Sequence, residues 1–574
     1  MAAGKLCDGA EASKGTSLPG LPLSLSFHNA LVECCHEPGD PVLKAQRVAT
    51  ALAMAMTLTP ALAPAMGRSA AASAQTYTND DPVLHRIWAM GMDSSRTYEF
   101  AQVLMDSIGP RLTGTPELKA AGDWLVSNYD AWGIPARTEQ YGTWRGWRRG
   151  PTHVDLISPR VRTLEATMLG WSPGTDGPVE GEVVALPMVG SAAEFGIWLT
   201  TARGKYVLIS APQLTCRPNQ SWEEYADQDV YQNMLETRDQ LASEWRAGIE
   251  RTGYTARTIP QALEQGGVAG VLTSTWSGGW GVTRIFGSRT EDVPSLDLSC
   301  EDYSLLFRLA ANEQGPLLRV DAQGEMLGDV PAYNTIAEFR GTELPDEYVV
   351  LSSHLDSWDG GSGATDTGAG TITILEAMRI LKEVYPNPKR TILVGHWGGE
   401  EQGLNGSRAF AQDNPDVVQG LHVLLNFDIG TGLVNDISMQ GMTGAGAHFS
   451  RWFAQMPSEL ADPLKLTLPG VPASGGTDHA SFLCYGVPAF RFGGRSWDYR
   501  TYTWHTNRDT FDKLVFEEVR HNATLIAAIT YLAAEDPERV SRDRRDAFPV
   551  DGSGESMTWP TCQDPERGWP GPGG

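Results

Sequence analysis

Strand-like and helix-like runs alternate along the chain from Tyr333 to about Glu535. A helical pattern such as Thr371 to Val384 separates short apolar runs that suit buried β-strands. The strand-like runs are residues 348–353, 391–395, 423–427 and 489–492. This alternation is typical of an α/β domain with a mostly parallel central sheet and helices on both faces. We therefore expect that fold for the main part of the chain.

The other segments differ from this pattern. Residues 82–143 are mainly helical, with a helix from Pro116 to Gly133, and we assign them to the first part of the main domain. Residues 144–330 contain short β runs and one polar helix, so we expect a β-rich unit inserted into the main domain, which resumes over residues 331–545. Residues 546–574 are rich in Gly, Pro and polar residues and are predicted to be disordered.

The apolar run from Val48 to Ala65 has the layout of a cleaved secretory signal, because basic residues precede it and small residues ending at Ala74 follow it. We expect residues 42–74 to be this signal peptide and residues 1–41 to be an extension from a start site assigned too early. A membrane anchor is the alternative, but two prolines interrupt the run. The mature protein is thus predicted to be secreted or periplasmic, with no stable membrane span after cleavage.

The net charge of the 574 residues is -25, which would repel nucleic acid and anionic lipid. We therefore expect no nucleic-acid partner. Four cysteines follow the predicted signal, without the short paired spacing of a zinc ribbon or a redox motif: Cys216, Cys300, Cys484 and Cys562. In an oxidising compartment they form one or two disulfides, or they stay as buried thiols; the sequence leaves the pairing open.

Residues that bind metals or transfer protons follow three of the strand-like runs. The first run ends at His354 and Asp356, the second at Glu400-Glu401 and the third at Asp428. Because the carboxyl ends of parallel strands share one rim of a sheet, these side chains are predicted to meet there. The same half of the domain contains Asp366 in a glycine-rich loop, Asp478-His479 and His505. Histidine and carboxylate ligands without thiolate suit zinc at a catalytic site.

Each of these residues has an ordinary interpretation when it stands alone. His354 is then a hydrogen-bonded loop residue, Asp366 a turn or helix cap, and Glu400-Glu401 a solvated surface pair. The glycine-rich loop from Asp359 to Gly370 fits neither the dinucleotide nor the Walker pattern, which argues against a phosphate site. The chain also lacks the G-x-S-x-G motif of serine hydrolases. The order of the residues at successive strand ends is what favours a metal site.

This order resembles zinc metallopeptidase family 28, the co-catalytic zinc aminopeptidases and their relatives. The stretches His354-Leu-Asp-Ser-Trp-Asp359 and Glu400-Glu-Gln-Gly403 are most similar to its plasma glutamate carboxypeptidase group, also called carboxypeptidase Q. The resemblance extends from about Pro82 to Glu535. It implies the zinc exopeptidase fold, and it implies that the inserted unit is a protease-associated domain that borders the cleft and helps to select substrates.

The resemblance also implies the roles of the site residues. Asp366 would bridge two zinc ions, with His354 and Asp428 completing one metal site and Glu401 and His505 the other. Two zinc ions, three carboxylates and a bridging hydroxide sum to zero formal charge, and metal binding lowers the pKa of water from about 15.7 to roughly 7.

Glu400 would be the general base, and the peptide bond between Asp366 and Thr367 would be cis. Relatives often carry a second acidic residue where this chain has Thr367. Asp356 is placed to accept the ring N–H of His354 that zinc does not use. His479 either lines the substrate pocket or is a structural residue.

The predicted function is that of a secreted zinc-dependent exopeptidase, which hydrolyses short peptides or dipeptides through a metal-bridging hydroxide. Two alternatives remain: a receptor-like binding ectodomain in which ligands have been lost, and a single-zinc glutaminyl cyclase. The intact ligand positions argue against the first, and the pair Glu400-Glu401 with Asp366 argues against the second. The sequence does not decide between aminopeptidase, carboxypeptidase and dipeptidase activity, nor whether the chain forms a homodimer.

Overall fold

A computed structural model describes residues 80–571 except residues 551, 553 and 555. The predicted N-terminal extension and signal peptide lie outside the described residues. Among the described helices, none is long and apolar enough to cross a membrane.

The main domain is built on a mixed sheet in which β10, β9, β11 and β14 are parallel neighbours. β8 and β12 flank this parallel group as antiparallel strands, and β13 lies beyond β12. The strands are β8 (Leu317–Phe339), β9 (Leu344–His354), β10 (Arg390–Trp397), β11 (Leu421–Asn426), β12 (Val434–Ser438), β13 (Lys465–Thr467) and β14 (Ala489–Gly494). The prediction of an α/β fold with a mostly parallel central sheet is confirmed.

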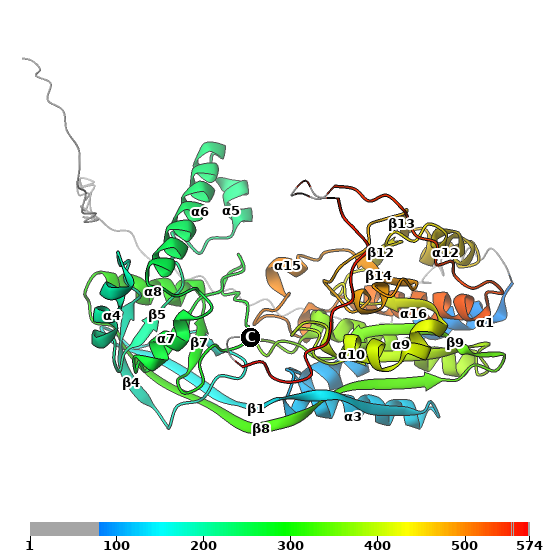
Figure 1. The fold of residues 1–574 in the computed structure, drawn as a ribbon, viewed down its shortest axis with the longest axis horizontal. Helices are drawn as coiled ribbons and strands as arrows, with labels where there is room; N and C mark the ends of the chain where they lie inside the picture. Colours follow the sequence, from blue (N-terminus) through cyan, green and yellow to red (C-terminus); the bar gives the residue numbers. More distant parts are fainter. Residues whose placement is uncertain (1–79, 551, 553, 555, 572–574) are drawn as a thin grey trace, which may run out of the picture. The chain divides into compact units, whose positions relative to one another are not determined.

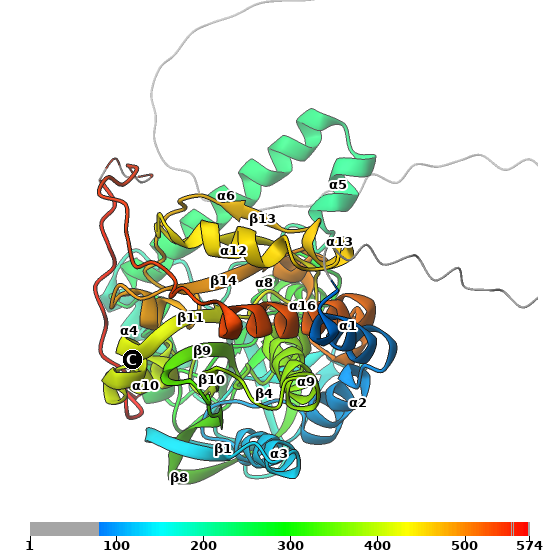
Figure 2. The same cartoon turned by 90° about the vertical axis from the view of Figure 1, so that its right-hand side faces the viewer.

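Helices cover both faces of this sheet. Along β10, His396 contacts Tyr129 of α3 and Trp397 contacts Phe410 of α10, and because neighbouring strand residues point to opposite faces, these helices lie on opposite sides. Figure 2 shows α9 and α16 together on one face and α10 on the other. The helices are α1 (Pro82–Trp88), α2 (Thr97–Ala101), α3 (Pro116–Ala131), α9 (Ala369–Val384), α10 (Asn405–Asp413), α11 (Pro415–Gly420), α12 (Ala445–Phe453), α13 (Ser458–Ala461), α14 (Ala480–Leu483), α15 (Tyr499–Tyr502) and α16 (Phe516–Glu535).

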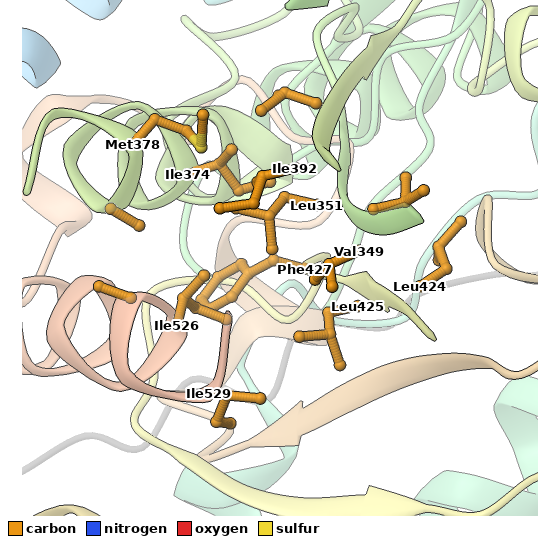
Figure 3. Close-up of a cluster of buried hydrophobic side chains, with 14 of the residues drawn as sticks. Val349, Leu351, Ile374, Met378, Ile392, Leu424, Leu425, Phe427, Ile526 and Ile529 are labelled. Carbon is orange, nitrogen blue, oxygen red and sulfur yellow. The ribbon is translucent and has the colours of Figure 1, made fainter. Parts of the chain in front are cut away.

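The core of the main domain lies between the central strands and the helix pair α9 and α16. Figure 3 shows their side chains gathered in one cluster, among them Leu351, Ile374 and Phe427. β10 and β11 are buried along their whole length and β9 is buried from Val349 to His354, which explains why these parts appear in the sequence as continuous apolar runs. Burial on both faces fixes the strands whose ends carry the candidate site.

The helix α3 begins at Pro116 as the sequence predicts and ends at Ala131, two residues before the predicted end at Gly133. The Thr115 side chain caps its first turn by accepting from the Leu118 N–H, and Pro116 occupies the first helical position, where no N–H is needed. Gly133 follows the helix with a positive φ of 71°, a conformation that favours glycine.

Two long strands connect the main domain to the inserted segment. β1 (Ala136–Ser158) pairs antiparallel with β8 from Ala136 to Ser158, and Figure 1 shows the two running side by side. The inserted segment therefore continues the main sheet instead of following a flexible linker. It adds β2 (Arg162–Thr163), β3 (Ala166–Met168), β4 (Val179–Ala185), β5 (Tyr206–Leu208), β6 (Gly270–Thr273) and β7 (Ser295–Leu298).

In the inserted segment, β4, β5, β6 and β7 are parallel neighbours with a hydrophobic core of their own. Helices occupy much of the segment, so the expected β-rich unit describes it incompletely. These helices are α4 (Ala192–Thr201), α5 (Asn219–Tyr225), α6 (Gln228–Arg251), α7 (Ile259–Gln265) and α8 (Cys300–Ala311). A disulfide between Cys216 and Cys300 links two parts of this segment.

The prediction that residues 546–574 are disordered is wrong for residues 556–571. These residues form no helix or strand, but a disulfide joins Cys562 to Cys484, and Arg567 pairs with Asp413. The indole of Trp569 packs against Trp144 and Trp171. A Gly- and Pro-rich composition predicts the lack of helices and strands, but it does not predict that a disulfide or the packing of a single tryptophan holds the segment in place. All four cysteines of the described residues are thus paired.

Candidate metal centre

The carboxyl ends of β9, β10 and β11 bring the predicted site residues to one rim of the sheet. In the parallel register His354 is opposite Trp397, and Asn426 is opposite Ser352. His354 is the last residue of β9, Glu400 and Glu401 follow β10, and Asp428 comes two residues after β11. Neighbouring parallel strands leave these side chains at the same edge.

Asp366 lies between two histidines. Its Oδ1 atom is 3.4 Å from Nε2 of His354, and its Oδ2 atom is 3.3 Å from Nε2 of His505. Each histidine also faces a second carboxylate: Asp428 Oδ1 is 3.8 Å from His354 Nε2, and Glu401 Oε2 is 3.0 Å from His505 Nε2. The five side chains thus form two triads, each of one histidine and two carboxylates, which share Asp366.

Three potential metal-ligand atoms at the centre of this cluster have no hydrogen-bond partner within the described residues. Nε2 of His354, Oδ2 of Asp366 and Oε1 of Glu401 are buried and accept or donate no hydrogen bond within the described residues. Donor atoms of these three side chains lie within 4.8 Å of one another. Buried carboxylates at such distances repel each other, and divalent cations offset that repulsion. Nitrogen and oxygen donors in this number fit borderline divalent metals such as zinc.

The segment that carries Asp366 is fixed by contacts that the sequence did not suggest. Asp509 accepts the backbone N–H of Asp366 at 3.0 Å and of Thr365 at 2.8 Å. The peptide bond between Asp366 and Thr367 is cis, as the family resemblance implied.

Arg111 supports the same loop through hydrogen bonds to its backbone. Its guanidinium is fully buried and donates to the backbone carbonyls of Ser362 and Gly363, and also to that of Leu355 just beyond β9. Burial lowers the pKa of Arg111 to about 10, and the nearby carboxylates, with Asp509 first, oppose that shift. Only the break Ile108-Gly-Pro-Arg111 between two helical patterns marked this region in the sequence.

Asp356 performs a different task from the predicted one. The ring Nδ1 of His354 meets the backbone carbonyl of Asp356 at 2.8 Å, whereas the carboxylate is 3.8 Å away. The carboxylate accepts the backbone N–H groups of Glu400 at 3.1 Å and Glu401 at 3.2 Å. Asp356 therefore stabilises the turn after β10, in which two successive backbone N–H groups donate to its one carboxylate.

The turn after β10 places the adjacent residues Glu400 and Glu401 in different surroundings. Glu401 pairs with His505, and the Glu400 backbone carbonyl accepts from the N–H of Gly403. Gly399 has φ 68°, and a Cβ atom there would lie 2.4 Å from the hydroxyl oxygen of Tyr141. Both the conformation and the close approach require glycine at this position.

In the protein without metal, the surroundings of the Glu400 carboxyl group favour its protonated form. Burial raises the pKa of Glu400 well above its usual value, His354 opposes the shift, and Asp478 and Glu401 add to it. Asp478 is itself fully buried, with a pKa raised to about 7, mainly by desolvation. Nearby cations would lower the pKa of Glu400 again.

His479 is completely buried and precedes α14, and burial lowers its pKa to about 3. A side chain without exposed surface suits the structural interpretation of this residue better than a pocket-lining role.

His505 is enclosed by aromatic rings from three parts of the chain. Its ring is stacked on Trp504 at 3.9 Å between centroids, with Phe286 at 5.4 Å and Trp358 at 6.1 Å. The inserted segment reaches this position: the Ile285 N–H donates to the His505 carbonyl. The insert therefore forms part of the wall around the site.

A cavity of about 530 Å³ lies beside the cluster. Thr365, the neighbour of Asp366, and Tyr499 line it. Trp280 of the inserted segment and Trp497 add half-exposed indoles. This space is large enough for an amino-acid side chain.

A second histidine and carboxylate group, His448 with Asp536 and Glu538, does not resemble a metal site. The guanidinium of Arg451 already pairs with both Asp536 and Glu538.

Comparison with known proteins agrees with this geometry. Residues 334–530 match the profile of peptidase family M28. Carboxypeptidase Q of Rattus norvegicus is 26% identical over 456 residues, which cover 79% of this chain and 88% of the relative, and the Homo sapiens protein is 26% identical over 453 residues with the same coverage.

Among solved structures, a peptidase M28 precursor from Shewanella amazonensis superposes with a TM-score of 0.57 at 24% identity, covering 80% of this chain and 97% of that chain. BSAP, a zinc aminopeptidase from Bacillus subtilis, superposes with a TM-score of 0.50 at 17% identity, covering 78% and 96%. At these identities the two structures support the fold.

The fold, the shared-carboxylate cluster and these relatives define a metallo-exopeptidase. Its residues 334–530 match peptidase family M28, and it is similar to carboxypeptidase Q over 79% of its length.

Proposed function

We propose that this protein is a secreted exopeptidase that hydrolyses short peptides or dipeptides with two zinc ions. The single observation that supports the two-metal site best is the position of Asp366, whose two carboxylate oxygens face two different histidines. One zinc ion would be held by His354, Asp366 and Asp428, and the other by Asp366, Glu401 and His505. Three protein ligands at each metal leave a position for water or substrate.

When bound, the zinc ions would supply Lewis acidity that acidifies water and polarises the scissile carbonyl. The protein residues supply the proton transfer and the orientation. Glu400 would accept a proton from the attacking water and deliver it to the leaving amine. It needs its carboxylate form for the first step, and the cations in its neighbourhood would reverse the rise in pKa that burial causes. Asp356 would fix the backbone of Glu400 and Glu401, so that each side chain stays oriented for its own role.

Secretion is supported by the apolar run at Val48 to Ala65 and by two disulfides, which persist in oxidising compartments. We assign the signal peptide to residues 42–74. The inserted segment would be a protease-associated domain, which fits its contact with the residues around His505.

The test compares wild-type protein with Glu400→Gln, which keeps the size of the side chain and removes the base. Bound zinc is measured by mass spectrometry, and hydrolysis is followed with a panel of dipeptides. We expect about two zinc ions per chain in both proteins and a fall in kcat of at least about a thousandfold in the variant. A wild-type protein that binds no zinc and hydrolyses none of the panel would instead favour a receptor-like binding role.

A further inference from the structure

A row of aromatic rings joins the C-terminal tail to the candidate metal centre. The ring centroid of Trp569 lies 5.1 Å from that of Trp171, which lies 5.9 Å from that of Trp358. The Trp358 ring in turn lies 6.1 Å from the ring of His505. Trp358 also lines a small space together with Asp366 and His505. The row therefore starts near the end of the described chain and ends at a predicted metal ligand.

The tail reaches this position because the main domain holds it in place. We call residues 562–571 the C-terminal strap. A disulfide fixes Cys562 to Cys484, and the carbonyl of Arg567 accepts a backbone N–H of β1 at 2.8 Å. A Cβ atom on Gly142 of β1 would lie 2.3 Å from that carbonyl oxygen, so glycine is needed where the strap crosses the strand. The strap thus follows a fixed path that brings Trp569 to the inserted segment.

Trp171, the second ring of the row, has a backbone conformation that depends on its neighbours. Its φ of 55° lies in the left-handed region, which a bulky residue adopts only where the surrounding structure enforces it. The side chain is 2% exposed, and its indole N–H donates to the carbonyl of Thr113 at 3.1 Å. A Cβ atom on Gly287 would lie 2.9 Å from the Trp171 ring, so this contact is closely packed. Trp569 adds to the enclosure, and its removal would open a gap beside Trp171.

The indole of Trp358 is oriented by ring packing and not by a hydrogen bond. The backbone after it is fixed, because Arg149 donates to the carboxylate and to the carbonyl of Asp359, both at 2.8 Å. The Nε1 atom of Trp358, however, is buried and has no hydrogen-bond partner within the described residues. The rings of Trp171 and Phe286, both in the inserted segment, lie 5.9 and 5.3 Å from it. The inserted segment thus sets how this indole lies against the metal centre.

We propose that Trp569 is a positioning residue of the metal centre: the C-terminal strap holds Trp171 against Trp358 and thereby keeps His505 in place. The proposal rests on the peptidase function proposed above. Trp569 is separated from His505 by two rings, so it acts through them and not by contact with metal or substrate. Of the two predicted metal sites, the one that includes His505 adjoins the row, and release of the strap should weaken that site first.

The physical reason is that neighbouring side chains relax into a gap when a large ring is removed. Movement of Trp171 and Trp358 toward such a gap would give the His505 ring more freedom and would admit water to the space beside Asp366. Surroundings outside the ligands orient them and control the access of solvent to a metal. The strap would therefore affect metal binding at a distance from the ligands.

The experiment compares the full chain with four variants: Trp569→Ala, Trp569→Phe, Gly142→Ala and the control Trp559→Ala. Gly142→Ala displaces the strap without changing Trp569, because the new methyl group would clash with the Arg567 carbonyl. Trp559 is another partly buried tryptophan of the tail, but it packs against the core of the main domain, and its N–H donates to Leu483. Thermal unfolding confirms that each variant is folded.

Two measurements follow the metal centre. Hydrogen exchange in metal-free protein reports on the peptides that contain Trp358 and His505, and it needs neither zinc nor turnover. Competition with a zinc chelator gives the affinities of the two metal sites. The values of kcat and KM for dipeptides are then measured at saturating zinc.

We expect Trp569→Ala and Gly142→Ala to exchange faster in both peptides and to bind one of the two zinc ions at least about tenfold less tightly. The other zinc ion should be unaffected. The change in kcat should exceed that in KM, because no strap residue lines the cavity beside the cluster. Trp569→Phe should restore part of the affinity, since the smaller ring still fills part of the gap. The control should match the wild type, because the disulfide at Cys562 separates Trp559 from the strap.

Unchanged exchange and zinc affinity in Trp569→Ala would overturn the proposal even if thermal stability falls, because the strap would then be only structural. Equal losses in Trp559→Ala would also overturn it, since they would indicate a general loosening of the tail. A wild type that binds zinc but hydrolyses no dipeptide would reject the peptidase function and leave the positioning role standing. If the wild type binds no zinc, the peptidase function fails, and exchange in the metal-free variants still decides the role of Trp569.

Discussion

Asp509 accepts a hydrogen bond of 3.0 Å from the backbone N–H of Asp366, so a carboxylate outside the predicted ligand set fixes the residue shared by both triads. The same carboxylate also accepts the hydroxyl of Thr365 at 2.8 Å. The shared position of Asp366 therefore depends on a second layer of contacts, which the sequence motifs do not include.

Replacing Asp509 with alanine should weaken metal binding. The loop would lose three acceptor contacts, and outer contacts of this kind typically contribute 10- to 100-fold in metal affinity, so we expect a loss of about that size. Competition with a zinc chelator measures it. Asp239→Ala, an exposed change on α6, is the control, and equal affinity in the two variants would remove the role assigned to Asp509.

Replacing Arg111 with methionine should destabilise the whole main domain. Methionine has similar length, but it leaves the carbonyls of Leu355 and Ser362 without the donors that Arg111 supplies. Removing one partner from a buried charged network costs about 3–5 kcal/mol in free energy of unfolding. Denaturant titration at fixed zinc concentration tests this against the exposed change Arg246→Met, and a difference below about 1 kcal/mol would contradict the prediction.

Removing the Cys484–Cys562 disulfide should loosen the C-terminal segment. The double change to serine frees residues anchored 78 positions apart, and we expect a loss of about 2–4 kcal/mol together with faster tryptic cleavage after Arg567. The corresponding change at Cys216 and Cys300 lies in the inserted segment and should leave cleavage at Arg567 unchanged. Mass spectrometry of the fragments separates the two outcomes.

Stability should fall as the pH decreases below about 6.5, in part because of His396. Burial lowers the pKa of this residue to about 3, so between that value and about 6.5 the unfolded chain binds a proton that the folded chain does not. The free energy of unfolding then decreases by up to about 1.36 kcal/mol per pH unit for this one group. His396→Gln keeps an acceptor for the Tyr129 hydroxyl and should flatten the slope, whereas the exposed change His153→Gln should not. Parallel slopes in all three proteins would disprove the assignment.

Much of the main domain could be predicted because its strands are buried on both faces. Continuous apolar runs such as residues 348–353 and 423–427 appear directly in the sequence; β9 includes the first, and β11 includes the second up to Asn426. The residues at the ends of these strands follow from the same pattern, since parallel strands place their carboxyl ends together. This is why His354 and Asp428 could be assigned to one site from sequence order.

Contacts between distant segments could not be predicted in this way. The carboxylate of Asp356 binds backbone N–H groups that come 44 and 45 residues later, and hydrogen-bond geometry, not sequence spacing, selects that partner over His354. The packing of Trp569 onto Trp144 joins the end of the chain to β1, and composition averages over such single anchors.

The sequence alone therefore determined the sheet, the rim and the identity of the side chains delivered to it, because hydrophobic periodicity and strand direction are local properties of the chain. Only the tertiary structure decided the two triads around Asp366, the pairing of the four cysteines and the packing of Trp569 against Trp171. Those arrangements depend on where separate segments lie in space, and burial, hydrogen bonding and charge fix them only after the chain has folded.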